Sequence, residues 1–426
     1  MGAPASAVGR ELLPDTAVVG GDGRLAVGGV DLCELAAEWG TPLFVYDEAH
    51  LRARCREALA AFGPGVAYAG KAFLCLAMAR LVAEEGLGLD VATGGELHCA
   101  LAAGFPPERL VLHGNNKSLA ELGRARELGI RVVVDSFDEL DRLDRLHADD
   151  PGPPLPVAVR VTPGVEAHTH AYVQTGQVDS KFGFGLAGGA AAEAVARVRA
   201  SPAMHLAGLH AHIGSQVFVV GSFEKAIAVL APFTAEAGVE ELCIGGGLGV
   251  PYVAGEEAPT IGAWAAGLRA AAQAAGLAVR ITAEPGRAIA AAAGVTLYTV
   301  GTVKRIPEVR TYVAVDGGMS DNPRPVLYGS GYEAFLARSV DAPRPLVAHV
   351  VGKHCESGDV VVRGARLPAD TAVGDVLCTP VTGAYGHAMA SNYNKVPRPA
   401  VVFVADGSAR VAVRRESLED LLRLDA

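Results

Sequence analysis

The stretch V-A-Y-A-G-K-A-F, from Val66 to Phe73, is a short apolar run that ends in a glycine and a lone lysine, Lys71. Its first half has the β-prone, apolar character of a buried strand, and an apolar pattern at helical spacing resumes after Phe73. A lysine at the end of a buried strand is partly desolvated, and a desolvated amine can act as a nucleophile. Most lysines are solvated surface groups, so the role of Lys71 depends on the rest of the chain.

Around this stretch, apolar β-prone runs alternate with segments whose apolar residues recur every three or four positions. The runs are Val66–Tyr68, Leu87–Ala92, Leu110–His113, Ile130–Asp135, Val157–Thr162, Leu206–His212, Leu242–Gly245 and Val279–Glu284. Strands that alternate with helices in this way predict an α/β protein with a (β/α)8 TIM-like barrel. A doubly wound open sheet would show the same alternation, but eight units favour closure.

The pattern changes to short alternating runs after residue 288. Turns such as Asp316-Gly317-Gly318 separate these runs, and helical spacing is scarce until Leu418–Leu424. This predicts an all-β domain, which the β-prone pieces before residue 46 would complete. We therefore expect an N-terminal segment (1–46) that joins the β domain, a barrel (47–288) and a C-terminal β domain (289–426).

The composition of the chain argues against several classes of protein. The net charge of −10 argues against partners such as nucleic acid or an anionic membrane. The seven cysteines are odd in number and include no C-x-x-C pair, which argues against a disulfide framework and a structural zinc. No apolar run reaches 18 residues and the start lacks a signal pattern, so we expect a cytoplasmic protein.

Polar or glycine residues stand at the ends of nearly all the predicted barrel strands. They are Lys71, Asp90, His113, Arg160, His212, Gly246, Gly247 and Glu284. The active site of such a barrel lies on the face where its strands end. Polar residues can simply mark strand ends, but this set is rich in groups that bind cofactors.

These residues permit several kinds of site. The glycines at 245–249 follow a strand and could bind a phosphate through backbone amides, although they lack the G-x-G-x-x-G spacing of a dinucleotide site. The pairs His210/His212 and His168/His170 have spacing that suits a metal, but no third ligand joins them at a sensible spacing, so we predict no metal. A strand-end lysine, a phosphate loop, the carboxylate of Glu284 and an imidazole together suggest pyridoxal phosphate.

With these residues in view, the sequence resembles the fold-type III pyridoxal-phosphate decarboxylases, and within them the diaminopimelate decarboxylases. The likeness extends from Gly40 to Asn394. Its motifs are Y-A-G-K-A-F at 68, H-G-N-N-K-S at 113, H-I-G-S-Q at 212, G-G-G-L-G at 245, E-P-G-R at 284, H-C-E-S-G-D at 354, and G-A-Y-G with S-N-Y-N from 383.

The resemblance implies roles for individual residues. Lys71 would bind the cofactor covalently, His212 would stack on its ring and Glu284 would pair with its ring nitrogen. Further cofactor contacts would come from Ser215, Gly246, Gly247, Gly286, Arg287 and Tyr385. The substrate would be bound by Arg287, Arg324, Tyr328, Glu356 and Tyr385. Cys355, supplied by the second subunit of a homodimer, would return a proton to the substrate.

The activity implied is decarboxylation of meso-2,6-diaminopimelate to L-lysine and carbon dioxide, the last step of lysine biosynthesis. A carboxylate at the ring nitrogen fits a decarboxylase, because racemases of this fold place an arginine there. Two alternatives stay open. One is a relative that acts on another carboxylated diamino acid in secondary metabolism. The other is a cofactor-binding regulator without turnover, which should lack Lys71 or Cys355.

Overall fold

The computed structural model describes residues 8–165 and 179–426, which form two compact units. The barrel unit contains residues 54–249 and 258–288, and the β unit contains residues up to 53 together with 250–257 and 289–426. Residues 250–257, which the sequence places within the barrel, thus group with the β unit. The domain limits at 46 and 288 remain a prediction.

The barrel unit is built on a parallel sheet that follows the order of the chain. Its eight strands, counted over the described residues, are β5 (Ala67–Ala69), β6 (Gly88–Val91), β7 (Leu110–Leu112), β8 (Arg131–Val134), β9 (Leu155–Thr162), β11 (Met204–His210), β12 (Glu241–Cys243) and β13 (Arg280–Thr282). A short strand, β10 (Phe184–Gly185), also pairs with β9.

Backbone hydrogen bonds close this sheet. Ala67 N donates to Ala283 O over 3.2 Å, and Ala69 N donates to Pro285 O over 3.3 Å, so the first strand meets the residues that follow the last. An open doubly wound sheet would leave these groups at two separate edges. The predicted (β/α)8 barrel is therefore confirmed.

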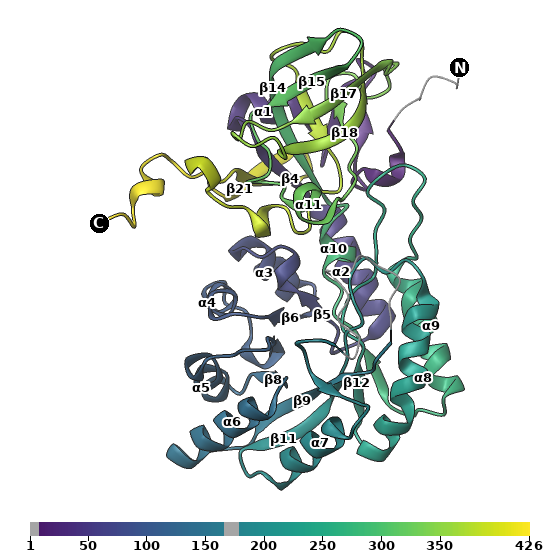
Figure 1. Cartoon of the computed structure of the whole chain (residues 1–426), viewed down its shortest axis with the longest axis vertical. Helices are drawn as coiled ribbons and strands as arrows, with labels where there is room; N and C mark the ends of the chain where they lie inside the picture. Colours follow the sequence, from purple (N-terminus) through teal and green to yellow (C-terminus); the bar gives the residue numbers. More distant parts are fainter. Residues whose placement is uncertain (1–7, 166–178) are drawn as a thin grey trace. The chain divides into compact units, whose positions relative to one another are not determined.

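Helices cover the outside of the barrel strands (Figure 1). They are α2 (Glu48–Phe62), which begins in the β unit, and α3 (Leu76–Glu84), α4 (Gly94–Ala102), α5 (Leu119–Leu128), α6 (Phe137–Asp149), α7 (Ala190–Ala200), α8 (Val220–Ala237) and α9 (Ile261–Ala274). The short helix α10 (Arg287–Ala290) follows the last barrel strand and ends in the β unit. Local sequence sets their limits. For example, Ser118 and Glu121 form a capping box that begins α5, and Gly129 ends it in the left-handed conformation.

The β unit contains a long mixed sheet and a small antiparallel one. The long sheet joins β18 (Val360–Leu367), β17 (Leu346–Val351), β15 (Arg310–Val315), β14 (Gly294–Ile306), β4 (Leu43–Asp47), β20 (Ala400–Ala405) and β21 (Ser408–Val413), with β19 (Val376–Thr379) and β16 (Phe335–Leu336) beside β14. The small sheet joins β1 (Val18–Val19), β2 (Leu25–Val27) and β3 (Val30–Asp31), and α1 (Leu32–Trp39) follows it.

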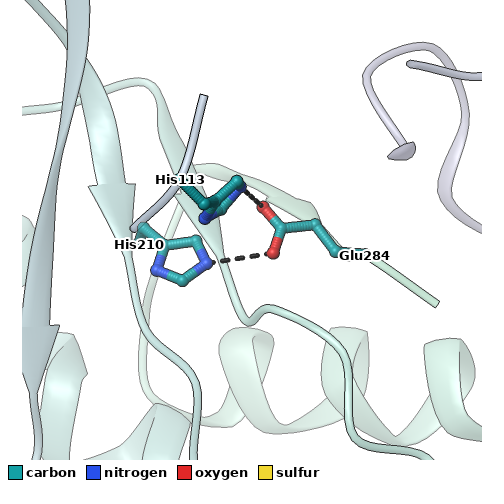
Figure 2. A group of neighbouring side chains, drawn as sticks. All are labelled: His113, His210 and Glu284. Carbon is teal, nitrogen blue, oxygen red and sulfur yellow. Dashed lines mark hydrogen bonds and ion pairs between the residues drawn. The ribbon is translucent and has the colours of Figure 1, made fainter. Parts of the chain in front are cut away.

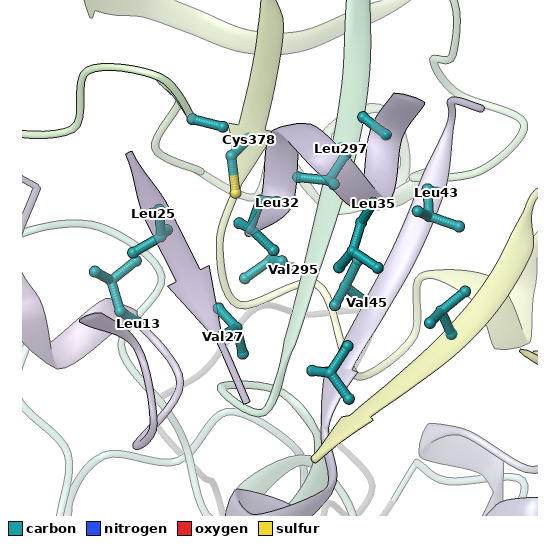
Figure 3. Close-up of a cluster of buried hydrophobic side chains, with 14 of the residues drawn as sticks. Leu13, Leu25, Val27, Leu32, Leu35, Leu43, Val45, Val295, Leu297 and Cys378 are labelled. Atoms are coloured by element: carbon teal, nitrogen blue, oxygen red, sulfur yellow. The ribbon is translucent and has the colours of Figure 1, made fainter. Parts of the chain in front are cut away.

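Both ends of the chain build this unit. Strand β4 lies between β14 and β20, pairing antiparallel with the first and parallel with the second. Figure 3 shows the apolar core that results, where Leu25 and Leu32 meet Val295, Leu297 and Cys378. The prediction that the N-terminal segment completes a C-terminal β domain is confirmed.

Two local predictions differ from the structure. The spacing at Leu418–Leu424 predicts a helix, but only a short 3-10 turn forms at Asp420–Leu422. Leu418, Leu422 and Leu424 are exposed, so no buried face supports a longer helix. The sequence also gave no sign of α11 (Arg324–Tyr328) within the β domain. Over the described residues, no helix is long and apolar enough to cross a membrane.

Candidate active site

The polar residues at the strand ends lie close together because backbone hydrogen bonds between neighbouring chain segments continue for a few residues past the end of each strand. His113 N donates to Val91 O over 2.8 Å, and Glu284 N donates to Gly245 O over 2.9 Å. These bonds fix the backbone just where the side chains leave the sheet. Since all the strands are parallel, these side chains gather at one end of the barrel.

Glu284 is at the centre of this cluster. Its Oε2 lies 3.0 Å from His210 Nε2 and its Oε1 lies 3.3 Å from His113 Nε2. Figure 2 shows both imidazoles directed at the carboxylate. Cys243 Sγ donates to Oε1 over 3.2 Å, and Asp90 Oδ1 lies 3.6 Å from His113 Nε2. Glu284, Asp90 and His210 are buried, each less than a tenth exposed.

The protonation states of this cluster follow from burial and charge. Burial alone would raise the pKa of Glu284, but the imidazoles of His210 and His113 outweigh it and hold that pKa well below its usual value. Burial opposes the charge of His113, yet attraction to Glu284 and Asp90 raises its pKa to about 9. Burial and the charge of Glu284 raise the pKa of Asp90 to about 7. Glu284 is therefore an ionised carboxylate in a buried position.

Lys71 lies on a single 3-10 turn, Gly70–Ala72, directly after β5. The buried hydroxyl of Tyr68 donates to Phe73 O over 2.8 Å and fixes this turn. The charge of Lys71 lowers the pKa of Asp90 and of His212, so its ammonium lies near the cluster. The sequence-based expectation of a desolvated lysine is wrong for this structure. Lys71 is exposed because the chain leaves the strand at Ala69, two residues earlier.

Glycines bring the backbone close around His212. Gly246 N donates to His212 Nδ1 over 3.2 Å, and burial keeps the pKa of this imidazole well below its usual value. A Cβ at Gly246 would lie 2.4 Å from Glu284 O, so a side chain cannot fit there. Gly247, at φ +110°, would place a Cβ 2.1 Å from Gly214 O. Only glycine allows this loop to lie so close to the strand ends.

Ser215 and Arg287 complete the predicted set in the barrel unit. Arg287 Nη2 donates to Ser215 Oγ over 2.9 Å, which joins the chain after β11 to the start of α10. Gly286 lies beside β5, where a Cβ would be 2.9 Å from Ala69 O. The structure thus places eight predicted site residues at the strand ends of the barrel. They are Lys71, His212, Ser215, Gly246, Gly247, Glu284, Gly286 and Arg287.

The other predicted site residues lie in the β unit. Arg324, the first residue of α11, is buried and donates from Nη1 to Tyr332 Oη over 2.6 Å. Its guanidinium carbon also lies 4.1 Å from the ring centre of Tyr252. Tyr328 ends the same helix, and Tyr385 has the left-handed backbone, at φ +58°. The aromatic rings hold the guanidinium of Arg324 in one orientation.

Cys355 and Glu356 lie on the turn between β17 and β18, and both are exposed. Asp359 holds this turn: it accepts hydrogen bonds from His354 N (3.0 Å) and Met319 N (2.7 Å) and pairs with His354 Nδ1 (2.7 Å). Cys355 N donates to Asn394 Oδ1 over 3.2 Å. The backbone of the turn is therefore fixed while the thiol faces outward.

The sequence missed the group that surrounds Glu284. It marked His113 and Asp90 as strand-end residues but gave them no role, and it found no third ligand to accompany His210. In the structure, ligand atoms of His113, His210 and Glu284 lie within 4.8 Å of one another, a spacing that could hold a metal ion. Spacing along the chain cannot reveal such a group, because three separate strands supply it. His168 and His170 lie outside the described residues.

The same three residues could instead bind a protonated ring nitrogen. Residues 48–291 match the family model described as the pyridoxal-binding domain of pyridoxal-dependent decarboxylases. The chain belongs to the pyridoxal-dependent decarboxylases. The ionised Glu284, the exposed amine of Lys71 and the glycine loop all fit pyridoxal phosphate, the cofactor of this family.

Curated relatives match this decarboxylase over nearly its whole length. Diaminopimelate decarboxylase from Actinosynnema pretiosum is 51% identical over 94% of this chain and 92% of its own. The enzyme of that name from Mycobacterium tuberculosis H37Rv is 48% identical over 95% of both chains. The crystal structure of diaminopimelate decarboxylase from M. jannaschii with L-lysine is 32% identical, has a TM-score of 0.89 and covers 97% of this chain and 98% of that one.

Proposed function

We propose that this decarboxylase converts meso-2,6-diaminopimelate to L-lysine and carbon dioxide, the last step of lysine biosynthesis. Full-length relatives of that name at 48–51% identity support this substrate. One structural observation supports the chemistry above all: a buried, ionised Glu284 held between two histidines at the strand ends of the barrel.

The chemistry of the residues fits this reaction. When bound, pyridoxal phosphate supplies an electron sink for the pair of electrons that carbon dioxide leaves behind. Glu284 offers the negative charge that keeps the ring nitrogen protonated, and Lys71 offers the amine that holds the cofactor. The backbone amides of Gly246 and Gly247 could bind its phosphate, in a loop that only glycine allows to lie so close to the strand ends. The neutral imidazole of His212 can stack on an aromatic ring.

The substrate end that does not react carries both a carboxylate and an ammonium. We propose that Arg287 and Arg324, with Tyr328 and Tyr385, bind the carboxylate, and that Glu356 binds the ammonium. Charge-assisted hydrogen bonds from guanidinium groups are strong and directional, and Arg324 is already oriented by Tyr332 and Tyr252. Ornithine and lysine lack this second carboxylate, so they should be poor substrates.

Release of carbon dioxide tests the proposed substrate. The holoenzyme should release it from meso-diaminopimelate, and L,L-diaminopimelate, ornithine and lysine should give much less. Specificity for the meso isomer would show that a D centre is required, and formation of L-lysine would show that this centre reacts. If the protein binds pyridoxal phosphate but releases no carbon dioxide from the meso isomer, the substrate assignment is wrong and another carboxylated diamino acid becomes the first choice.

We also propose a cytoplasmic homodimer in which Cys355 of one subunit serves the site of the other. The exposure of the Cys355 thiol on a rigid turn supports this, because the thiol can reach a second molecule. The structure describes all seven cysteines, and none of them forms a disulfide, which agrees with a reducing compartment.

Mixed subunits provide the test of a shared site. Lys71→Ala and Cys355→Ala proteins should each be nearly inactive. Mixing them with subunit exchange should restore activity, because a hybrid dimer would contain one site with both residues intact. Exchange is verified with two different affinity tags, and self-mixed samples are the controls. If verified hybrids stay inactive, Cys355 does not act across subunits.

A further inference from the structure

His113 stands between two buried carboxylates. Its Nε2 lies 3.3 Å from Glu284 Oε1 and 3.6 Å from Asp90 Oδ1, and its ring meets that of His210 edge to face at 5.1 Å. The four side chains come from four different strand ends. Two carboxylates this close together cannot both stay ionised in a buried place unless a positive charge lies beside them.

The other histidine cannot easily supply that charge. Burial lowers the pKa of His210 and so disfavours a positive charge on its ring, whose Nε2 lies 3.0 Å from Glu284 Oε2. Cys243 also contributes only a neutral donor, because burial and the charge of Glu284 raise its pKa well above the usual value. His113, whose pKa is raised, is therefore the cation that balances Glu284 and Asp90.

We propose that His113 is a positioning residue of the cofactor site, whose imidazolium keeps Glu284 ionised and oriented so that the carboxylate can pair with the ring nitrogen. This inference rests on the proposed function only through the cofactor, and not through the substrate. Without His113, Glu284 would lose one of its two imidazole partners and part of the attraction that lowers its pKa. The carboxylate would then hold its charge and its orientation less firmly, and it would pair less well with the ring nitrogen of the cofactor.

Binding of two cofactor analogues tests this role without turnover. The apoprotein is titrated with pyridoxal phosphate and with its 1-deaza analogue, in which carbon replaces the ring nitrogen. The wild type should prefer pyridoxal phosphate. His113→Leu should reduce this preference about 10-fold or more, because one pKa unit at Glu284 corresponds to a tenfold change in equilibrium. Its affinity for the deaza analogue should stay within about 2-fold of the wild-type value, because this analogue has no ring nitrogen for Glu284 to pair with. For comparison, a loss of about 1.4 kcal/mol in binding would be a tenfold change.

Two further variants make the test specific. His113→Gln keeps an N–H donor without the charge, so its preference should fall between wild type and His113→Leu; it also carries the test if His113→Leu fails to fold. Asp90→Asn added to His113→Leu removes the competing acid and should restore much of the preference. His205→Leu, on the exposed face of β11, is the matched control and should match the wild type.

The outcomes separate the explanations. Equal loss of affinity for both ligands would show a merely structural role, and an unchanged preference would show that His113 does not influence Glu284; either result overturns the proposal. A wild type that prefers pyridoxal phosphate but releases no carbon dioxide from meso-diaminopimelate would contradict the proposed substrate and leave this inference standing.

Discussion

Replacing Lys71 with alanine should lower carbon dioxide release about 10⁴-fold, the upper range for loss of one group that transfers protons in the transition state. The amine is also the proposed covalent attachment of the cofactor. Its loss therefore removes the attachment and the proton carrier together, and the substrate must react with cofactor held only by non-covalent contacts. We expect the Michaelis constant to change much less than the turnover number.

The measurement pairs activity with covalent trapping. Borohydride treatment of the wild-type holoenzyme should fix the cofactor on the peptide that contains Lys71, and the variant should release it on denaturation. Lys225→Ala, which removes an exposed lysine of α8, is the control and should retain both properties. Trapping of the cofactor at another lysine in wild-type protein would contradict the assignment of Lys71.

The second large effect concerns stability. Lys117→Met should lower the free energy of unfolding of the barrel by about 3–5 kcal/mol, because it leaves the buried Glu139 without its partner. Lys117 Nζ lies 2.7 Å from Glu139 Oε1 and donates to Gly114 O (2.7 Å) and Val133 O (2.6 Å). Both side chains are about 2% exposed, so water cannot replace the lost bonds.

A double variant separates charge from packing. Adding Glu139→Gln removes the unpaired charge and keeps an acceptor for Asp135 N, which donates to Glu139 over 3.0 Å. This should recover about 1–3 kcal/mol, the cost of a buried polar group without a partner. Unfolding can be followed in a Trp39→Phe background, where the buried Trp264 of α9 is the remaining tryptophan and reports on the barrel. A loss below about 1 kcal/mol for Lys117→Met would place this pair among weak surface ion pairs.

This ion pair also connects stability to the site. Lys117 holds Gly114, the residue that follows His113, and so fixes the loop from which His113 reaches Glu284. Gly114 has φ +120°, and a Cβ there would lie 3.2 Å from Ala92 O. The H-G-N-N-K-S motif therefore contains three residues with separate tasks. His113 positions the cofactor, Gly114 allows the backbone to pass close to Ala92, and Lys117 holds the loop through its hydrogen bond to Gly114 O.

Asp90 and Glu284 show how the surroundings of two carboxylates can give them different pKa values. Their carboxylates share His113, yet the pKa of Glu284 is held well below its usual value and that of Asp90 is raised to about 7. Glu284 accepts hydrogen bonds from His210 and Cys243 in addition, whereas burial dominates at Asp90. Two acids with the same chemistry thus differ in how readily they ionise, as in enzymes that divide acid and base roles between paired carboxylates.

The sequence by itself determined the barrel, the β domain and the family. Alternation of apolar runs with helical spacing is a local signal, and each run needs only its own residues to predict a strand or a helix. Through their resemblance to a known family, the long motifs also predicted cofactor-binding roles for Lys71, His212 and Glu284. The same local signal failed at Leu418–Leu424, where no buried surface is present to support a helix.

Only the tertiary structure decided which groups act on one another. Asp90, His113, His210 and Glu284 are far apart in the chain and meet because closure of the barrel brings four strand ends together. Burial at these strand ends sets the protonation states of the four side chains. The ion pair of Lys117 and Glu139 likewise depends on the burial that the fold creates around both residues. Lys71 is exposed because the chain turns one residue before it. Charge and burial depend on what surrounds a side chain in space, so no pattern along the sequence could supply them.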